Sequence, residues 1–91
     1  MIKITNKPDI KSFGITPVML RDDYISTIIL DGHTIPCIKI GGNTRQINEK
    51  RKSYTVNEYD IQCTVPDSRG EYLWFCFTTD AMDNEILYVT Y

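Results

Sequence analysis

The chain has few of the residues that favour helices. Its 91 residues include one Ala, four Leu and four Glu, against thirteen Ile, ten Thr and six Tyr. Ala, Leu and Glu are among the better helix formers, whereas β-branched and aromatic residues are enriched in strands. The composition therefore predicts an all-β or mainly β protein with little helix. The length predicts a single β domain over residues 1–91.

Strong net charge is also missing. The formal charge is −2 at neutral pH, whereas a dedicated nucleic-acid binder usually has a clear positive excess. A highly acidic mimic of DNA would have the opposite excess. No apolar run approaches the ~20 residues of a membrane-spanning helix, and the first residues are too short and alternating for a signal peptide. We expect no membrane association and a cytoplasmic location.

The residues that support catalysis or metal binding are sparse. His33 is the only histidine, and no Cys-x-x-Cys pair occurs. His33 and Cys37 lie four residues apart, about 13 Å along one strand, too far for proton transfer or for binding one metal ion. Gly41-Gly42 lacks the Lys and Ser/Thr of a phosphate-binding loop. We expect no catalytic residue, no metal and no cofactor, so the chain is not predicted to be an enzyme.

The number and placement of the cysteines predict no disulfide framework. Three cysteines, Cys37, Cys63 and Cys76, are an odd number, and all fall in predicted strands. A small secreted domain more often has an even set that forms a disulfide framework. We expect all three to be buried, reduced thiols.

Large apolar residues are concentrated at the C-terminal end. Residues 71–79 and 85–91 contain the single Trp, two of the three Phe and three of the six Tyr. The first of these segments is apolar on both alternating faces, which favours a central strand buried on both sides. Residues 80–84 are expected to form a turn that ends with Asn84 near the left-handed region.

Turn residues divide the rest of the chain into further strands. Asp31-Gly32 predicts a two-residue hairpin turn, and Pro36 suggests a sheet edge at that point. A helical turn is allowed at residues 8–11, after Pro8. Strands are predicted at residues 1–5, 15–20, 24–30, 33–40 and 53–65, in addition to the two C-terminal ones. Six or seven strands joined by short turns indicate an antiparallel barrel or sandwich.

The predicted strand at residues 53–65 changes phase. Its apolar residues occupy even positions up to Val56 and odd positions from Tyr59, so a β-bulge is expected near residues 57–58. A turn at residues 67–70, with Gly70 in the left-handed region, would place Cys63 opposite Trp74.

Basic residues cluster in one polar stretch. Residues 44–52 are predicted to form a long loop, because Ile47 is their only apolar residue. Charged loops on a rigid scaffold often carry recognition, and Arg and Tyr are frequent interface anchors. The candidate partner-binding residues are Arg45, Lys50, Arg51, Lys52 and Tyr54.

Three functions remain open at this point. The first is a non-catalytic binding protein that acts through protein–protein contacts, such as a phage or mobile-element inhibitor of a host enzyme or defence system in the host cytoplasm. Abundant Ile, Lys, Asn and Tyr suggest an AT-rich gene, which is frequent in such elements. The second is a small β-barrel that binds nucleic acid or nucleotides through basic and aromatic residues. The third is a structural or assembly subunit with exposed strand edges. The sequence leaves monomer and homo-oligomer equally open.

Overall fold

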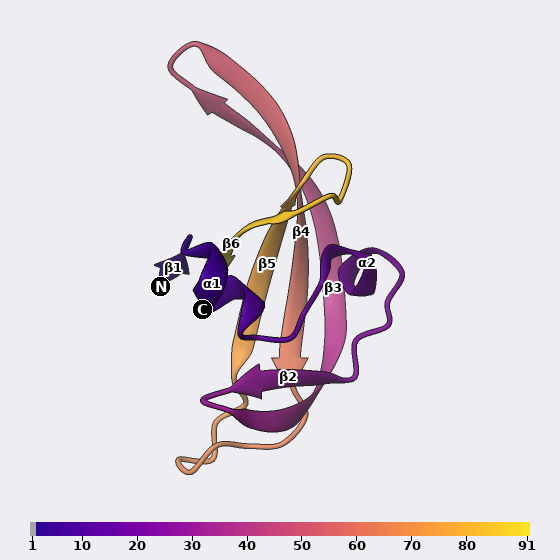
Figure 1. Ribbon diagram of the computed structural model, residues 1–91, viewed down its shortest axis with the longest axis vertical. Helices are drawn as coiled ribbons and strands as arrows, with labels where there is room; N and C mark the ends of the chain where they lie inside the picture. The colour runs from indigo at the N-terminus through magenta and orange to yellow at the C-terminus, as the bar shows by residue number, and fades with distance from the viewer. Residues whose placement is uncertain (1) are drawn as a thin grey trace.

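The computed structural model describes residues 2–91 and contains six strands and two short helices (Figure 1). The predicted mainly β class with little helix is confirmed. The predicted strand over residues 1–5 is present as a short β1, and its first residue lies outside the described residues. The elements in chain order are β1 (Lys3–Ile4), α1 (Lys7–Lys11), α2 (Pro17–Arg21), β2 (Thr27–Leu30), β3 (His33–Glu49), β4 (Lys52–Cys63), β5 (Trp74–Asp80) and β6 (Ile86–Thr90).

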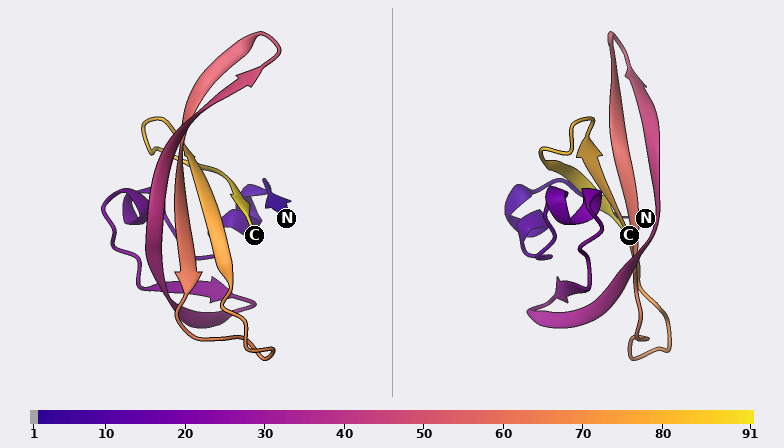
Figure 2. Two further views of the ribbon diagram at one scale, coloured as in Figure 1. Left: turned by 180° about the vertical axis from the view of Figure 1, so that it is seen from behind. Right: turned by 90° about the vertical axis from the view of Figure 1, so that its right-hand side faces the viewer.

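All strand pairs are antiparallel, in the spatial order β1-β6-β5-β4-β3-β2. The start of β3 pairs with β2, and from Cys37 onward β3 pairs with β4. Around this change of partner the sheet curls into a half-barrel (Figure 2). The carbonyl of Pro36 accepts a hydrogen bond from the amide of Thr64. Pro36 thus stands where the β3–β4 ladder begins, and its missing donor interrupts neither strand pair.

The segment before β3 covers only one face of the sheet. In the right-hand view of Figure 2, α1, α2 and β2 all lie on the same side of β3–β6, and the other side is bare. Hydrophobic side chains of the segment pack on those of the sheet in one core. The buried members are Ile10, Phe13, Ile15, Leu20, Ile25, Ile28, Cys37, Ile61, Cys63, Phe75, Phe77, Ile86 and Val89.

The aromatic strand β5 lies between β4 and β6, as expected for a central strand. Phe75 and Phe77 are buried, and the ring of Phe13 packs against both with centroid distances of 5.8 Å. The expectation that both faces of this strand are buried holds only in part, because no second layer covers the outer face: Thr78 on that face is buried, but the start of the strand is not. Trp74, on that face, is 48% exposed.

The predicted strand at residues 15–20 is wrong, because a helix begins there. Thr16 is extended and its hydroxyl accepts a hydrogen bond from the Met19 amide at 3.3 Å, and Pro17 follows at the first helical position. A hydroxyl cap followed by Pro is a common helix start. The expected helical turn at residues 8–11 is confirmed as α1.

The predicted loop at residues 44–52 is also wrong. β3 continues through this stretch to Glu49 and pairs with β4 down to Glu49↔Lys52. Polar side chains pair across the two strands: Ser53 donates to Asn48 at 2.6 Å and Thr44 to Asn57 at 3.0 Å. This pair of strands therefore forms without regularly spaced apolar residues, because cross-strand polar pairs also stabilise a strand pair.

The phase change in β4 has a different explanation from the predicted bulge. The β4–β5 register is unbroken from Val56 to Gln62, and the register shift in the β3–β4 pair falls at Ile40 of β3. Val56 and Ile61 consequently lie on opposite faces of β4, and both are fully buried. A central position in the sheet can bury an outer-face side chain between its cross-strand neighbours.

Two connections differ from the prediction by one residue. Trp74 pairs with Gln62 rather than with Cys63, since the Asp67 carboxylate accepts bonds from the amides of Arg69 and Glu71 and shapes a longer loop. In the β5–β6 loop the left-handed residue is Asp83, with φ 55°, and not Asn84. The Asp31-Gly32 turn and the left-handed Gly70 are confirmed.

Candidate binding site: the β3–β4 arm

The β3–β4 hairpin extends beyond the rest of the sheet. β5 pairs with β4 only as far as Val56↔Asp80, so residues 46–55 form a two-stranded ribbon on their own, which we call the arm (Figure 1). Four residue pairs separate its base from its tip. At about 3.4 Å per residue the tip stands roughly 14 Å beyond the sheet.

The turn at the tip is strained. Glu49↔Lys52 is the last strand pair, which leaves Lys50 and Arg51 as a two-residue turn, and Lys50 has φ 34°. Such turns usually place Asn, Asp or Gly at positive φ, because longer side chains are disfavoured there. The sequence thus retains a cation where a smaller residue would relax the backbone. Strained positions of this kind occur often at functional sites.

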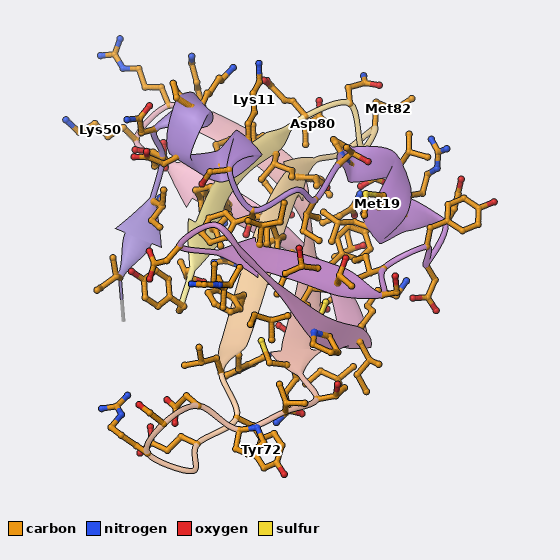
Figure 3. All side chains as sticks on the ribbon, turned by 60° about the horizontal axis from the view of Figure 1, so that its bottom comes forward. Lys11, Met19, Lys50, Tyr72, Asp80 and Met82 are labelled. Atoms are coloured by element: carbon orange, nitrogen blue, oxygen red, sulfur yellow. The ribbon has the colours of Figure 1, made fainter. Side chains whose placement is uncertain are left out.

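The structure brings together three of the five predicted binding residues. Lys50, Arg51 and Lys52 are adjacent and exposed at the tip, and the side chain of Lys50 extends outward (Figure 3). Tyr54 lies beside them, 38% exposed, and its hydroxyl donates to Glu49 at 3.3 Å. Burial of the ring, and then the Glu49 carboxylate, raises the pKa of Tyr54, so its phenol stays neutral.

Arg45 is separate from this group. It lies at the base of the arm, where its guanidinium donates to Glu58 at 3.1 Å and to the Tyr88 hydroxyl at 3.4 Å. The Glu58 carboxylate raises the pKa of Arg45 further, so the guanidinium stays charged. Its charge is largely satisfied within the protein. We therefore assign Arg45 to anchoring the arm and not to the tip.

Charge is divided between the arm and the body. The arm has three basic residues and one acidic residue, a net charge of +2, whereas the remaining residues have seven basic and eleven acidic, a net charge of −4. The Debye length at physiological salt is about 8 Å. A tip roughly 14 Å from the sheet is therefore largely screened from the negative body.

The β5–β6 loop is fastened to the base of the arm by one carboxylate. Oδ1 of Asp83 accepts hydrogen bonds from Thr79 Oγ1 at 2.6 Å, Tyr59 Oη at 3.0 Å and Asn57 Nδ2 at 3.1 Å. Asn57 adjoins Val56, where the arm leaves the sheet. This arrangement joins the β5–β6 loop to the sheet at the point where the arm begins.

Sequence reasoning missed the bare outer face of the sheet. Ile38 and Trp74 flank Gln62 in one row of that face, and Ile40 lies at the register shift beside them. Each of the three is about half exposed. The alternation of Trp74 with Phe75 and Phe77 could have indicated this exposed face. Because all three residues are apolar, the same pattern also predicts burial on both faces.

Other polar features lie away from the arm. His33 is exposed at the start of β3. A hollow of about 380 Å³ lies between α1 and β6, and at its rim Lys7 and Glu85 form an ion pair at 2.8 Å. Over residues 2–91 no three His, Cys, Asp or Glu side chains are grouped so that they could hold a metal ion. Among the same residues, neither helix is long and apolar enough to cross a membrane.

Comparison of this chain with protein-family models, with curated proteins and with solved structures finds no match.

Proposed function

We propose that this chain is a non-catalytic binding protein whose arm occupies an acidic surface of a protein partner and thereby blocks it. The observation that carries the proposal is the exposed basic tip, Lys50-Arg51-Lys52, held away from an acidic body. In a host cell invaded by a phage or other mobile element, a host enzyme or defence protein would be a suitable target.

The form of the arm supports occlusion of a cleft. A two-stranded ribbon with four residue pairs beyond the sheet is narrow enough to enter a groove, and the Asp83 contacts hold its base. Arg and Tyr, both present near the tip, are enriched among the residues that dominate binding energy at protein interfaces. Preorganisation of the arm reduces the entropy lost on binding.

The experiment compares two matched double variants. Arg51→Gln/Lys52→Gln removes two charges from the tip, and Lys11→Gln/Arg69→Gln removes two from exposed positions of the body. With tagged protein and lysate treated with nuclease, we expect the wild type and the body variant to retain the same partner. Truncation of a residue that dominates an interface costs at least ~2 kcal/mol, and we expect Arg51 to be such a residue, so the tip variant should bind about thirtyfold more weakly.

Two results would count against the proposal. Equal retention by both variants would show that the arm is not the contact. A complex that disappears on nuclease treatment would favour the alternative described next.

Nucleic-acid binding is the second candidate, since the major groove of a duplex admits a two-stranded β-ribbon. Tyr54 beside the tip also offers a ring for stacking on single strands. Three tip cations predict a slope of about −2.7 for log K against log salt on duplex DNA. Fluorescence anisotropy at low salt tests this, and the tip variant should reduce the slope to about −1. The net charge of −4 on the body favours the protein partner over this reading.

The two outermost strands of the sheet, β1 and β2, give little support to a role as an assembly subunit. β1 has two residues and β2 has four, and the Ile29 amide of β2 already donates to the Phe13 carbonyl. Short and partly occupied, β1 and β2 offer few free groups for pairing with another chain. Among residues 2–91 the edge of β3 from residue 38 to 49 that faces away from β4 has no partner strand, so it is the edge that an assembly role would use.

A further inference from the structure

Two of the three cysteines face each other across the β3–β4 pair. Cys37 and Cys63 are directly opposite in the register, and each is 2% exposed. Both belong to the hydrophobic core, so their side chains are on the covered face of the sheet. In the structure both are free thiols.

The backbone hydrogen bonds define the kind of strand pair. The Cys37 amide donates to Ser26 on the β2 side, and the Cys63 amide donates to Leu73 on the β5 side. The neighbouring Thr64 amide donates to Pro36. Cys37 and Cys63 therefore direct their amides away from each other, which makes them a non-hydrogen-bonded pair.

This geometry approaches that of a disulfide. In a non-hydrogen-bonded pair the Cα atoms are about 4.5 Å apart and the Cβ atoms about 4.5–5.5 Å. A disulfide needs Cα atoms about 4.4–6.8 Å apart and Cβ atoms about 3.5–4.5 Å apart. The Cα distance already fits, and the Cβ atoms need to approach by about 1 Å or less.

We propose that Cys37 and Cys63 form an oxidisable pair, a redox modification site whose co-substrate is a small-molecule disulfide such as glutathione disulfide. The thiolate of one cysteine attacks the small disulfide, forms a mixed disulfide and releases one small thiolate. The second cysteine thiolate then attacks the protein sulfur of the mixed disulfide, forms the Cys37–Cys63 bond and releases the second small thiolate. The two protein thiols lose two protons and two electrons, and the small disulfide is reduced to two thiols.

The third cysteine, Cys76, lies on the wrong face of the sheet to join this disulfide. Cys76 pairs in register with Asp60, one residue from Ile61, whose side chain points to the core. Alternation therefore places Cys76 on the opposite, outer face, away from Cys37 and Cys63. It serves as an internal control for the specificity of the reaction.

Burial makes the folded protein slow to react. Burial raises the pKa of Cys37 to about 11, with a smaller contribution from the adjacent Cys63, and burial also raises the pKa of Cys63. Because the thiolate is the attacking species, exchange occurs mainly in opened or unfolded chains. Once formed, the disulfide closes a loop of 27 residues from Cys37 to Cys63, and this loop includes the whole arm.

The test is refolding from urea in the presence of glutathione disulfide and glutathione. We expect the intact mass to fall by two hydrogens and peptide mapping to identify Cys37–Cys63. Closing a loop of this length should raise the melting temperature by on the order of 10 °C. The Cys76→Ser variant should give the same product, and Cys63→Ser should give none.

Three outcomes would overturn the proposal: no intrachain disulfide in wild type at any glutathione ratio, a disulfide that includes Cys76, or an oxidised protein that melts at a lower temperature than the reduced one. The mapping uses wild-type protein, so the test remains decisive even where Cys63→Ser fails to fold.

Discussion

The carboxylate of Asp83 offers the sharpest test of how the arm is held. In Asp83→Ala, Tyr59 loses its hydrogen-bond acceptor, whereas Asn57 and Thr79 each retain the carbonyl of Asp80 as a second acceptor. A net hydrogen bond contributes about 0.5–1.5 kcal/mol, and more when the acceptor is charged. Asp83 also has φ 55°, where Ala is disfavoured by about 1 kcal/mol.

We therefore expect Asp83→Ala to lower the free energy of unfolding by about 2–3 kcal/mol. Asp31→Ala is the matched control, because Asp31 has a similar φ of 50° in an exposed turn. No hydrogen bond from its side chain occurs among the described residues, so it should lose only about 1 kcal/mol. Asp83→Asn keeps both an oxygen acceptor and a residue that tolerates positive φ, and should fall between wild type and Asp83→Ala.

Urea denaturation followed by circular dichroism measures all four proteins. The reasoning requires the two alanine variants to differ by at least about 1 kcal/mol, the contribution of the hydrogen bonds alone. If Asp83→Ala and Asp31→Ala agree within error, the contacts of Asp83 do not stabilise the fold, and the arm is not fastened in the way described.

Two further predictions concern the arm tip and alkaline pH. Lys50→Asn should raise the melting temperature by a few degrees, since Asn tolerates φ 34° better than Lys and the gain in stability is up to about 1 kcal/mol. Lys52→Asn makes the same charge change at a residue without positive φ, so it should give no gain. Equal melting temperatures for the two variants would refute strain at Lys50. Stability should also fall at alkaline pH, because burial raises the pKa of Cys37 and of Cys76 to about 11 and that of Tyr59 to about 12. The raised pKa values mean that the folded state favours the neutral forms of these groups. Their contribution to the free energy of unfolding is therefore complete below the ordinary thiol pKa of 9.0. It is lost as the pH rises through about 11 for the thiols and about 12 for Tyr59. A urea midpoint that stays constant from pH 8.5 to 11.5 would contradict this.

Local chemistry in the sequence determined several features without help from the fold. Scarce Ala, Leu and Glu and abundant Ile and Thr predicted the mainly β class, because these preferences act residue by residue. Asp31-Gly32 specified its turn because few residue pairs accept two positive φ angles. The aromatic segment predicted a central strand, since the largest apolar side chains need neighbours on both sides within the sheet.

Other features depended on which strands became neighbours. The arm was missed because its strands are stabilised by cross-strand polar pairs such as Asn48–Ser53, and no single strand carries that signal. The one-sided cover of β5 was missed because alternation of apolar residues does not reveal how many layers will pack on a sheet. Likewise, the chain order gives no sign that Cys37 will face Cys63 or that Asp83 will reach Asn57. Only the tertiary structure decided that the basic residues of a polar stretch would stand at the end of a projecting ribbon, because a partner strand, and not the sequence of either strand alone, makes a ribbon stable.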